Sequence, residues 1–198
     1  MPETDFRRLQ LLVLDVDGVM TDGRIILTPD GQEIKAFDSK DGAGIKYWIR
    51  AGGQVAFITG RSSAAVQVRA DDLGVQVVRM YAKDKLPVYR EVLAELGLDA
   101  AQAVVMGDDL PDLPLLRECG FSAAPSDAVP EIRQAVDYIA TLPGGRGCVR
   151  EVIDVVLKKS GRWGRIMARY LPAPALRAPK RGVQPGGSRL EQAEDPVQ

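Results

Sequence analysis

Short apolar runs alternate with segments of helical spacing along most of this chain. The apolar runs are typical of buried strands and comprise Leu11 to Leu14, Val55 to Thr59, Val75 to Met80, Ala103 to Met106, and shorter pieces around Phe121 and Tyr138. Helical spacing occurs near residues 42–51, 63–72, 84–96, 110–118, 127–135 and 147–158. Because strands that alternate with helices form parallel sheets covered on both faces, the sequence predicts a doubly wound α/β fold with a mainly parallel sheet.

One insertion interrupts this alternation after the first strand. Residues 24–27 and 33–37 flank a Pro29-Asp30-Gly31 turn, which predicts an inserted β-hairpin over about residues 24–38. Residues 86–103 are filled by one helix, so neither place holds a separate cap domain. We therefore expect an open pocket in the monomer, and closure by a neighbouring subunit, because an open site admits water and selects poorly.

The composition changes towards the end of the chain. From about Lys158, Pro, Gly and Arg replace core-forming patterns. We place the folded domain at residues 1–172 and predict a flexible Pro/Gly/Arg-rich tail over residues 173–198. Residues 163–171, just before this boundary, could instead form a short helix that docks on the domain.

Composition excludes several classes of site. The chain has no histidine, which rules out Ser-His-Asp triads, Cys-His pairs and histidine-bound metals. Cys119 and Cys148 are far apart and predict neither a disulfide framework nor a zinc site. With 26 basic and 27 acidic residues, we expect no general attraction to nucleic acid or to a membrane surface. No secretion signal or membrane-spanning run is visible, so we expect a cytoplasmic enzyme that uses carboxylates or lysine.

Two acidic groups follow predicted strands. Asp15 and Asp17 come directly after the strand that ends at Leu14, and residues 107–112 (GDDLPD) follow the strand that ends at Met106. The carboxyl ends of these strands converge in an open α/β sheet. One carboxylate of the Asp-x-Asp pair can attack while the other exchanges protons. Crowded carboxylates also require a hard divalent cation, and Mg²⁺ is the natural choice.

Donor groups for phosphoryl oxygens lie between the two acidic groups. Thr59, Gly60 and Arg61 end one strand, and Lys85 opens the following helix. Lys83 is an alternative to Lys85, although its position favours a solvated side chain. Arg61 is either a partner of phosphate or of a sugar carboxylate, or a surface cation held by nearby carboxylates.

Four segments, LDVDGVMTDG, ITGRSS, the lysine in KDKLPVYREVL, and VMGDDLPDLPLL, resemble the haloacid dehalogenase-like (HAD) hydrolases over about residues 11–157. The details DVDGVMTDG, DSKDGAGIKYW, TGRSS, GDDLPD and GGRGCVREV resemble the HAD phosphatases that act on 3-deoxy-D-manno-octulosonate (KDO) 8-phosphate. The resemblance implies a Rossmann-like fold and a homotetramer assembled through the hairpins. It also implies Mg²⁺-dependent hydrolysis of this small phosphorylated sugar acid to KDO and phosphate, in lipopolysaccharide precursor synthesis.

The same resemblance assigns roles to individual residues. Asp15 is the implied nucleophile that becomes an aspartyl-phosphate, and Asp17 protonates the leaving oxygen and then activates water. The implied Mg²⁺ ligands are the Asp15 carboxylate, the Asp17 backbone carbonyl and Asp108. Thr59 and Lys85 are implied to bind phosphoryl oxygens, and Arg146 is implied to contact the substrate. Asp109 and Asp112 are implied to contact the metal ligands or to lie near them. Residues 144–147, which contain Arg146, are otherwise an ordinary helix entry.

Other functions stay open at this level. The nearest alternative is a phosphatase for another acidic sugar phosphate, such as a sialic-acid-type 9-phosphate. A phosphoacceptor signalling domain is a different class, but its acceptor would follow the third strand, where this chain has residues 80–83, MYAK. A catalytically silent binding subunit is disfavoured, because every expected catalytic group is present.

Overall fold

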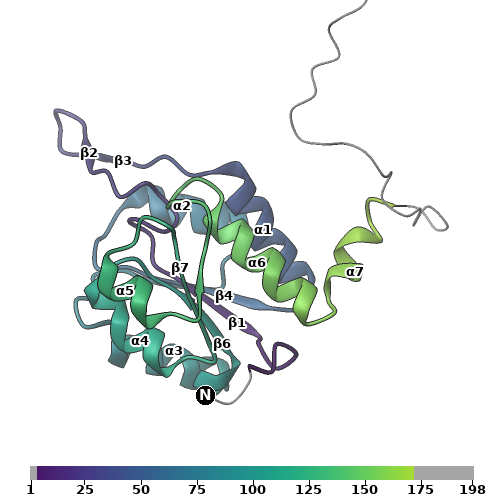
Figure 1. Ribbon diagram of the computed structural model, residues 1–198. Helices are drawn as coiled ribbons and strands as arrows, with labels where there is room; N and C mark the ends of the chain where they lie inside the picture. The colour runs from purple at the N-terminus through teal and green to yellow at the C-terminus, as the bar shows by residue number, and fades with distance from the viewer. Residues whose placement is uncertain (1–3, 172–198) are drawn as a thin grey trace, which may run out of the picture.

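The computed structural model describes residues 4–171, so the tail predicted for residues 173–198 lies outside the described residues (Figure 1). The main sheet has the order β5-β4-β1-β6-β7-β8, and every neighbouring pair is parallel. Its strands are β1 (Leu11–Leu14), β4 (Gln54–Ile58), β5 (Val77–Arg79), β6 (Ala103–Met106), β7 (Phe121–Ala124) and β8 (Tyr138–Ile139). The predicted mainly parallel sheet is confirmed.

The strand order reverses direction between β1 and β6. From β1 the chain moves outward to β4 and β5, then returns to the other side of β1 and moves outward through β6, β7 and β8. The two central strands are buried at every residue, which explains why their sequences are continuously apolar. A crevice forms at the carboxyl ends of strands where the order reverses, so the fold places its ligand site after β1 and β6.

Helices cover both faces of the sheet (Figure 1). The core on one face contains side chains from α1 (Ser39–Arg50), α2 (Ala64–Leu73) and α6 (Cys148–Lys159), and the core on the other contains side chains from α3 (Lys85–Leu96), α4 (Leu113–Glu118) and α5 (Pro130–Ala135). Two short 3₁₀ turns, η1 (Ala100–Gln102) and η2 (Leu110–Asp112), flank β6. The predicted helix at residues 110–118 is divided into η2 and α4, each with a proline in its first turn.

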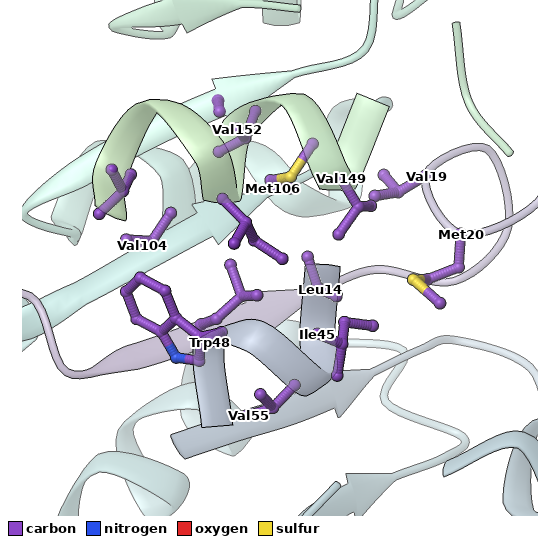
Figure 2. Close-up of a cluster of buried hydrophobic side chains, with 14 of the residues drawn as sticks. Leu14, Val19, Met20, Ile45, Trp48, Val55, Val104, Met106, Val149 and Val152 are labelled. Atoms are coloured by element: carbon purple, nitrogen blue, oxygen red, sulfur yellow. The ribbon is translucent and has the colours of Figure 1, made fainter. Parts of the chain in front are cut away.

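The largest buried cluster lies between the sheet and the pair α1 and α6. Figure 2 shows Ile45 and Trp48 of α1 in one cluster with Leu14, Met106 and the valines of α6. Trp48 is fully buried, and its indole N–H donates to the Gln54 carbonyl oxygen at 2.9 Å. Removing each such side chain from water contributes about 1.5–3 kcal/mol, so this cluster fixes α6 firmly against β1 and α1.

A buried carboxylate also joins these two helices. Asp41 of α1 is fully buried, and its oxygens accept hydrogen bonds from the backbone N–H groups of Gly147 at 3.1 Å and Arg150 at 2.8 Å. Gly147 is the N-cap of α6 and Arg150 lies in its first turn, where no helical carbonyl is available to accept these N–H groups. A side chain of one helix therefore caps the amino end of another.

Replacing Asp41 with alanine is expected to lower the free energy of unfolding by about 2–4 kcal/mol, because two buried N–H groups lose their acceptor. Urea unfolding followed by circular dichroism measures the change. Glu91→Ala is the matched control, because Glu91 is exposed on α3, and its effect should stay within about 0.5 kcal/mol. Equal midpoints for the two variants would contradict this role of Asp41.

The predicted hairpin is confirmed, with short strands. Strand β2 (Ile26–Leu27) pairs antiparallel with β3 (Glu33–Ile34), and the hairpin extends away from the sheet (Figure 1). Ile25, Ile26 and Leu27 are exposed, and so is Ile34. The hairpin therefore presents apolar side chains on its outer surface.

A short helix follows α6. Helix α7 (Trp163–Met167) buries Ile166 in the core that α1 and α6 share, so a docking helix forms within residues 163–171. Over residues 4–171, no helix is both long enough and apolar enough to cross a bilayer.

Candidate active site

The two acidic groups meet at the crevice between β1 and β6. Leu14 lies opposite Met106 in the parallel register, and the backbone N–H of Asp15 donates to the Met106 carbonyl oxygen at 3.1 Å. Asp15, Asp108 and Asp112 each place a carboxylate oxygen within 4.8 Å of the others. The structure thus brings together side chains from separate segments, as the strand pattern predicts.

Glycines allow this close approach. Gly18 has φ +97°, and a Cβ built on it would lie 2.1 Å from Oδ2 of Asp108. A Cβ on Gly107 would lie 2.3 Å from the Cβ of Asp112. Any larger residue at either position would displace a carboxylate, so Gly18 makes room for Asp108.

Lys85 is a buried cation that lies between two of these carboxylates. Its Nζ lies 2.6 Å from Oδ1 of Asp15 and 2.6 Å from Oδ1 of Asp112. Burial opposes its charged form, but the negative charges of Asp15 and Asp112 prevail and raise the pKa of Lys85. Lys83 is exposed. Of the two lysines considered from sequence, Lys85 is therefore the one that lies in the carboxylate cluster.

The cluster carries excess negative charge, since three carboxylates face one ammonium group. Burial, together with the charges of Asp15 and Asp112, raises the pKa of Asp108 to about 8. Burial and Asp112 raise the pKa of Asp15 to about 6, against the opposing effect of Lys85. Close-set carboxylate oxygens with uncompensated charge fit a hard divalent cation such as Mg²⁺.

Asp109 and Asp112 occupy different environments. Oδ2 of Asp112 accepts from the backbone N–H groups of Asp108 at 3.1 Å and Asp109 at 3.4 Å, so this carboxylate organises the loop as well as holding Lys85. Asp109 is exposed and accepts from the N–H of Leu110 at 2.8 Å as the cap of η2. Asp112 therefore belongs to the three-carboxylate group, whereas Asp109 shapes the turn beside it.

The segment after β4 lies next to the Asp15 strand. Thr59 is buried, and its hydroxyl oxygen accepts from the N–H of Arg61 at 3.4 Å, which bends the chain around Gly60. The guanidinium group of Arg61 is about half exposed and donates to Oε1 of Glu33 at 3.0 and 3.2 Å. The strand after the hairpin turn thus reaches the phosphate-binding segment predicted from sequence.

The hairpin also reaches Asp17. The ammonium group of Lys35, just after β3, donates to Oδ1 of Asp17 and lies 3.4 Å from Oε2 of Glu33. Neither Lys35 nor Glu33 was among the residues predicted for the site. The alternation of Glu33, Ile34 and Lys35 was the available signal, because residues two apart on a strand share a face.

The segment of residues 144–147 braces the loop that follows Asp15. The N–H of Gly145 donates to the Val19 carbonyl oxygen at 2.9 Å, and a Cβ on Gly144 would lie 1.9 Å from the Gly18 carbonyl oxygen. Gly147, the N-cap of α6, has φ +104°. Arg146 is largely exposed, with its guanidinium group 3.9 Å from Oδ2 of Asp22. The helix-entry interpretation is thus correct, and the segment also supports the acidic loop.

Comparison with known proteins identifies the family. A family model for haloacid dehalogenase-like hydrolases matches residues 81–147. The KDO 8-phosphate phosphatase KdsC of Yersinia pestis is 42% identical over 149 residues, which cover 75% of this chain and 80% of that protein. The chain belongs to the haloacid dehalogenase-like hydrolase family. The KdsC phosphatase of Salmonella typhi is 38% identical over 159 residues, covering 80% of this hydrolase and 85% of the relative.

Solved structures agree with this assignment. The KDO 8-phosphate phosphatase of Moraxella catarrhalis, in complex with magnesium, phosphate and KDO, has a TM-score of 0.81 and 37% identity. The match covers 84% of this hydrolase and 95% of that chain. A cobalt-bound phosphatase from Haemophilus influenzae has a TM-score of 0.77 and 35% identity, covering 79% and 91%. The predicted HAD fold is confirmed, and the acidic cluster of this hydrolase can hold the kind of ion that its relatives contain.

Proposed function

We propose that this hydrolase is a Mg²⁺-dependent phosphomonoesterase that converts KDO 8-phosphate to KDO and inorganic phosphate, a step towards lipopolysaccharide. The observation that carries the proposal is the meeting of Asp15, Asp108 and Asp112 around Lys85 at the crevice of the sheet. The named substrate is supported by relatives with 38–42% identity that are KDO 8-phosphate phosphatases.

Two carboxylates perform the covalent chemistry. The Asp15 carboxylate attacks phosphorus and forms an aspartyl-phosphate while the bond from phosphorus to the sugar oxygen breaks. Asp17 gives its proton to that leaving oxygen and then accepts a proton from the water that attacks the aspartyl-phosphate. The bond between Asp15 and phosphorus breaks, which releases phosphate and restores both groups.

The remaining residues hold charge and position. The Asp15 carboxylate, the Asp17 backbone carbonyl and Asp108 would hold Mg²⁺, which when bound supplies positive charge beside the phosphoryl oxygens. Lys85 and Thr59 bind phosphoryl oxygens, and Asp112 keeps Lys85 in place. Asp109 caps η2 and so helps to shape the turn that contains Asp112.

Recognition of the sugar acid requires a cation near the mouth of the site. Arg61, with Gly60 beside it, is about half exposed; its guanidinium group donates to Glu33 through Nε and Nη2 and has further N–H groups that suit a carboxylate. A nine-carbon acidic sugar carries the same carboxylate, so a sialic-acid-type 9-phosphate is the competing substrate. Arg146, exposed beside the Asp15 loop, is a second candidate contact.

A panel of sugar phosphates tests the proposed substrate. Phosphate release with Mg²⁺ should show kcat/KM for KDO 8-phosphate at least about tenfold above that for a nine-carbon acidic sugar 9-phosphate. A preference for the nine-carbon compound would replace the named substrate but keep the phosphatase. No release from any member of the panel would overturn the function.

We also propose that the enzyme is a homotetramer joined through its hairpins. Exposed Ile25, Ile26, Leu27 and Ile34 form an apolar surface on an element that also reaches the site. Such a surface favours contact with another subunit, which would shelter the open pocket. Sedimentation equilibrium measures the mass, and a monomer at micromolar concentration would contradict the proposal.

A further inference from the structure

Two charged side chains on the inner face of the hairpin are buried. The Lys35 side chain is 1% exposed and that of Glu33 is 8% exposed, although Ile34 between them faces outward. Lysine and glutamate on a projecting hairpin ordinarily extend into water. Their burial requires compensating partners, and those partners are residues of the proposed active site.

These side chains form a row of alternating charges. Lys35 donates to Oδ1 of Asp17 and lies 3.4 Å from Oε2 of Glu33, whose Oε1 holds the guanidinium group of Arg61 at 3.0 Å. Asp17 belongs to the loop after β1, and Arg61 to the segment after β4. The hairpin is thereby attached to the two segments that the proposed reaction uses.

The two oxygens of Asp17 are not equivalent. Oδ1 is held by Lys35, whereas Oδ2 is buried and has no hydrogen-bond partner within residues 4–171. Proton transfer requires the donor and acceptor to lie about 2.6–3.2 Å apart, so a small rotation of this carboxylate would impair it. Because Lys35 already donates to Oδ1, the oxygen of Asp17 that remains to exchange a proton is Oδ2.

We infer that Lys35 is a positioning residue, which holds Asp17 so that its second oxygen exchanges the proton of the leaving group, with Glu33 keeping Lys35 in place. This inference rests on the proposed function. The hairpin then contributes to the chemistry of its own subunit, in addition to any contact with a neighbour. If the contact only anchored the hairpin, its loss would affect all substrates alike.

The test compares Lys35→Met with wild type on phenyl phosphate and p-nitrophenyl phosphate. Phenolate is a poor leaving group that needs a proton, whereas p-nitrophenolate departs readily without one. Because kcat/KM includes only the steps through departure of the first product, the later attack of water does not enter it. We expect kcat/KM to fall about 10–100-fold for phenyl phosphate and to stay within about threefold for p-nitrophenyl phosphate.

The substrates and controls separate this inference from neighbouring explanations. Both aryl phosphates lack a carboxylate, so an error in the named sugar does not affect the comparison. Lys40→Met, at an exposed lysine of α1, should leave both values within about twofold. Glu33→Gln, which retains Lys35, should show the same substrate selectivity with a smaller loss. Equal losses on both substrates, or no loss on phenyl phosphate, would overturn the inference.

Discussion

Asp15→Asn is expected to lower kcat for phosphate release by at least about a thousandfold, on the order of 4 kcal/mol. Asparagine has nearly the shape of aspartate, and its side-chain oxygen can still accept from Lys85, which lies 2.6 Å from Oδ1 of Asp15. The amide is a very poor nucleophile, so the covalent step is lost while the site keeps its form. Steady-state release from KDO 8-phosphate at saturating Mg²⁺ measures the effect.

The control for this variant is another Asp→Asn change. Asp71 is exposed on α2 and accepts a hydrogen bond from the Gln67 side chain, so Asp71→Asn should change kcat by less than about twofold. Unfolding midpoints of both variants establish that the fold is intact. A rate for Asp15→Asn within tenfold of wild type would exclude Asp15 as the nucleophile.

Chelation of divalent cations is expected to have the second largest effect. EDTA should lower kcat on the order of a thousandfold, with full recovery when Mg²⁺ is restored in excess. The reason is that the positive charge of the cation lowers the free energy of the transition state by several kcal/mol. In Asp108→Asn, which lacks one of the three clustered carboxylates, the Mg²⁺ concentration for half-maximal activity should rise about 10–100-fold.

Stability measurements distinguish loss of a cation site from misfolding. Burial and neighbouring carboxylates raise the pKa of Asp108 to about 8, so without cations Asp108→Asn should unfold at a temperature no lower than wild type. Added Mg²⁺ should raise the melting temperature of wild type and have little effect on the variant. Activity that is insensitive to EDTA, or equal Mg²⁺ requirements, would contradict the metal site.

The sequence allowed the framework of the site to be predicted, because strand patterns are local. Continuous apolar runs identified β1 and β6, and the acidic residues directly after them had to meet at one sheet edge. Lys85 was preferred to Lys83 on its position and on the family resemblance, and the geometry places Lys85 among the carboxylates. The roles of these residues in catalysis and metal binding stay predictions until the experiments above are done.

The contacts that could not be predicted join distant segments through side chains. Asp41 caps a helix whose first turn contains Arg150, and Arg61 meets Glu33 across the hairpin. Such pairs depend on how helices and loops pack after the sheet has formed, and neither residue type nor spacing specifies the partner. The sequence shows that Glu33 and Lys35 share one face of the hairpin. It does not show which part of the molecule that face contacts.

The support that residues 144–147 give to the Asp15 loop has a consequence for synthesis of the protein on the ribosome. All the proposed catalytic groups, from Asp15 to Asp112, emerge before Gly144 and Gly145, which contact that loop, and before α6, which completes the core beneath it. A nascent chain can therefore contain all the proposed catalytic side chains while the Asp15 loop still lacks the contacts that support it. The proposed catalytic centre is therefore complete only after α6 (Cys148–Lys159) has been translated and has packed against the sheet.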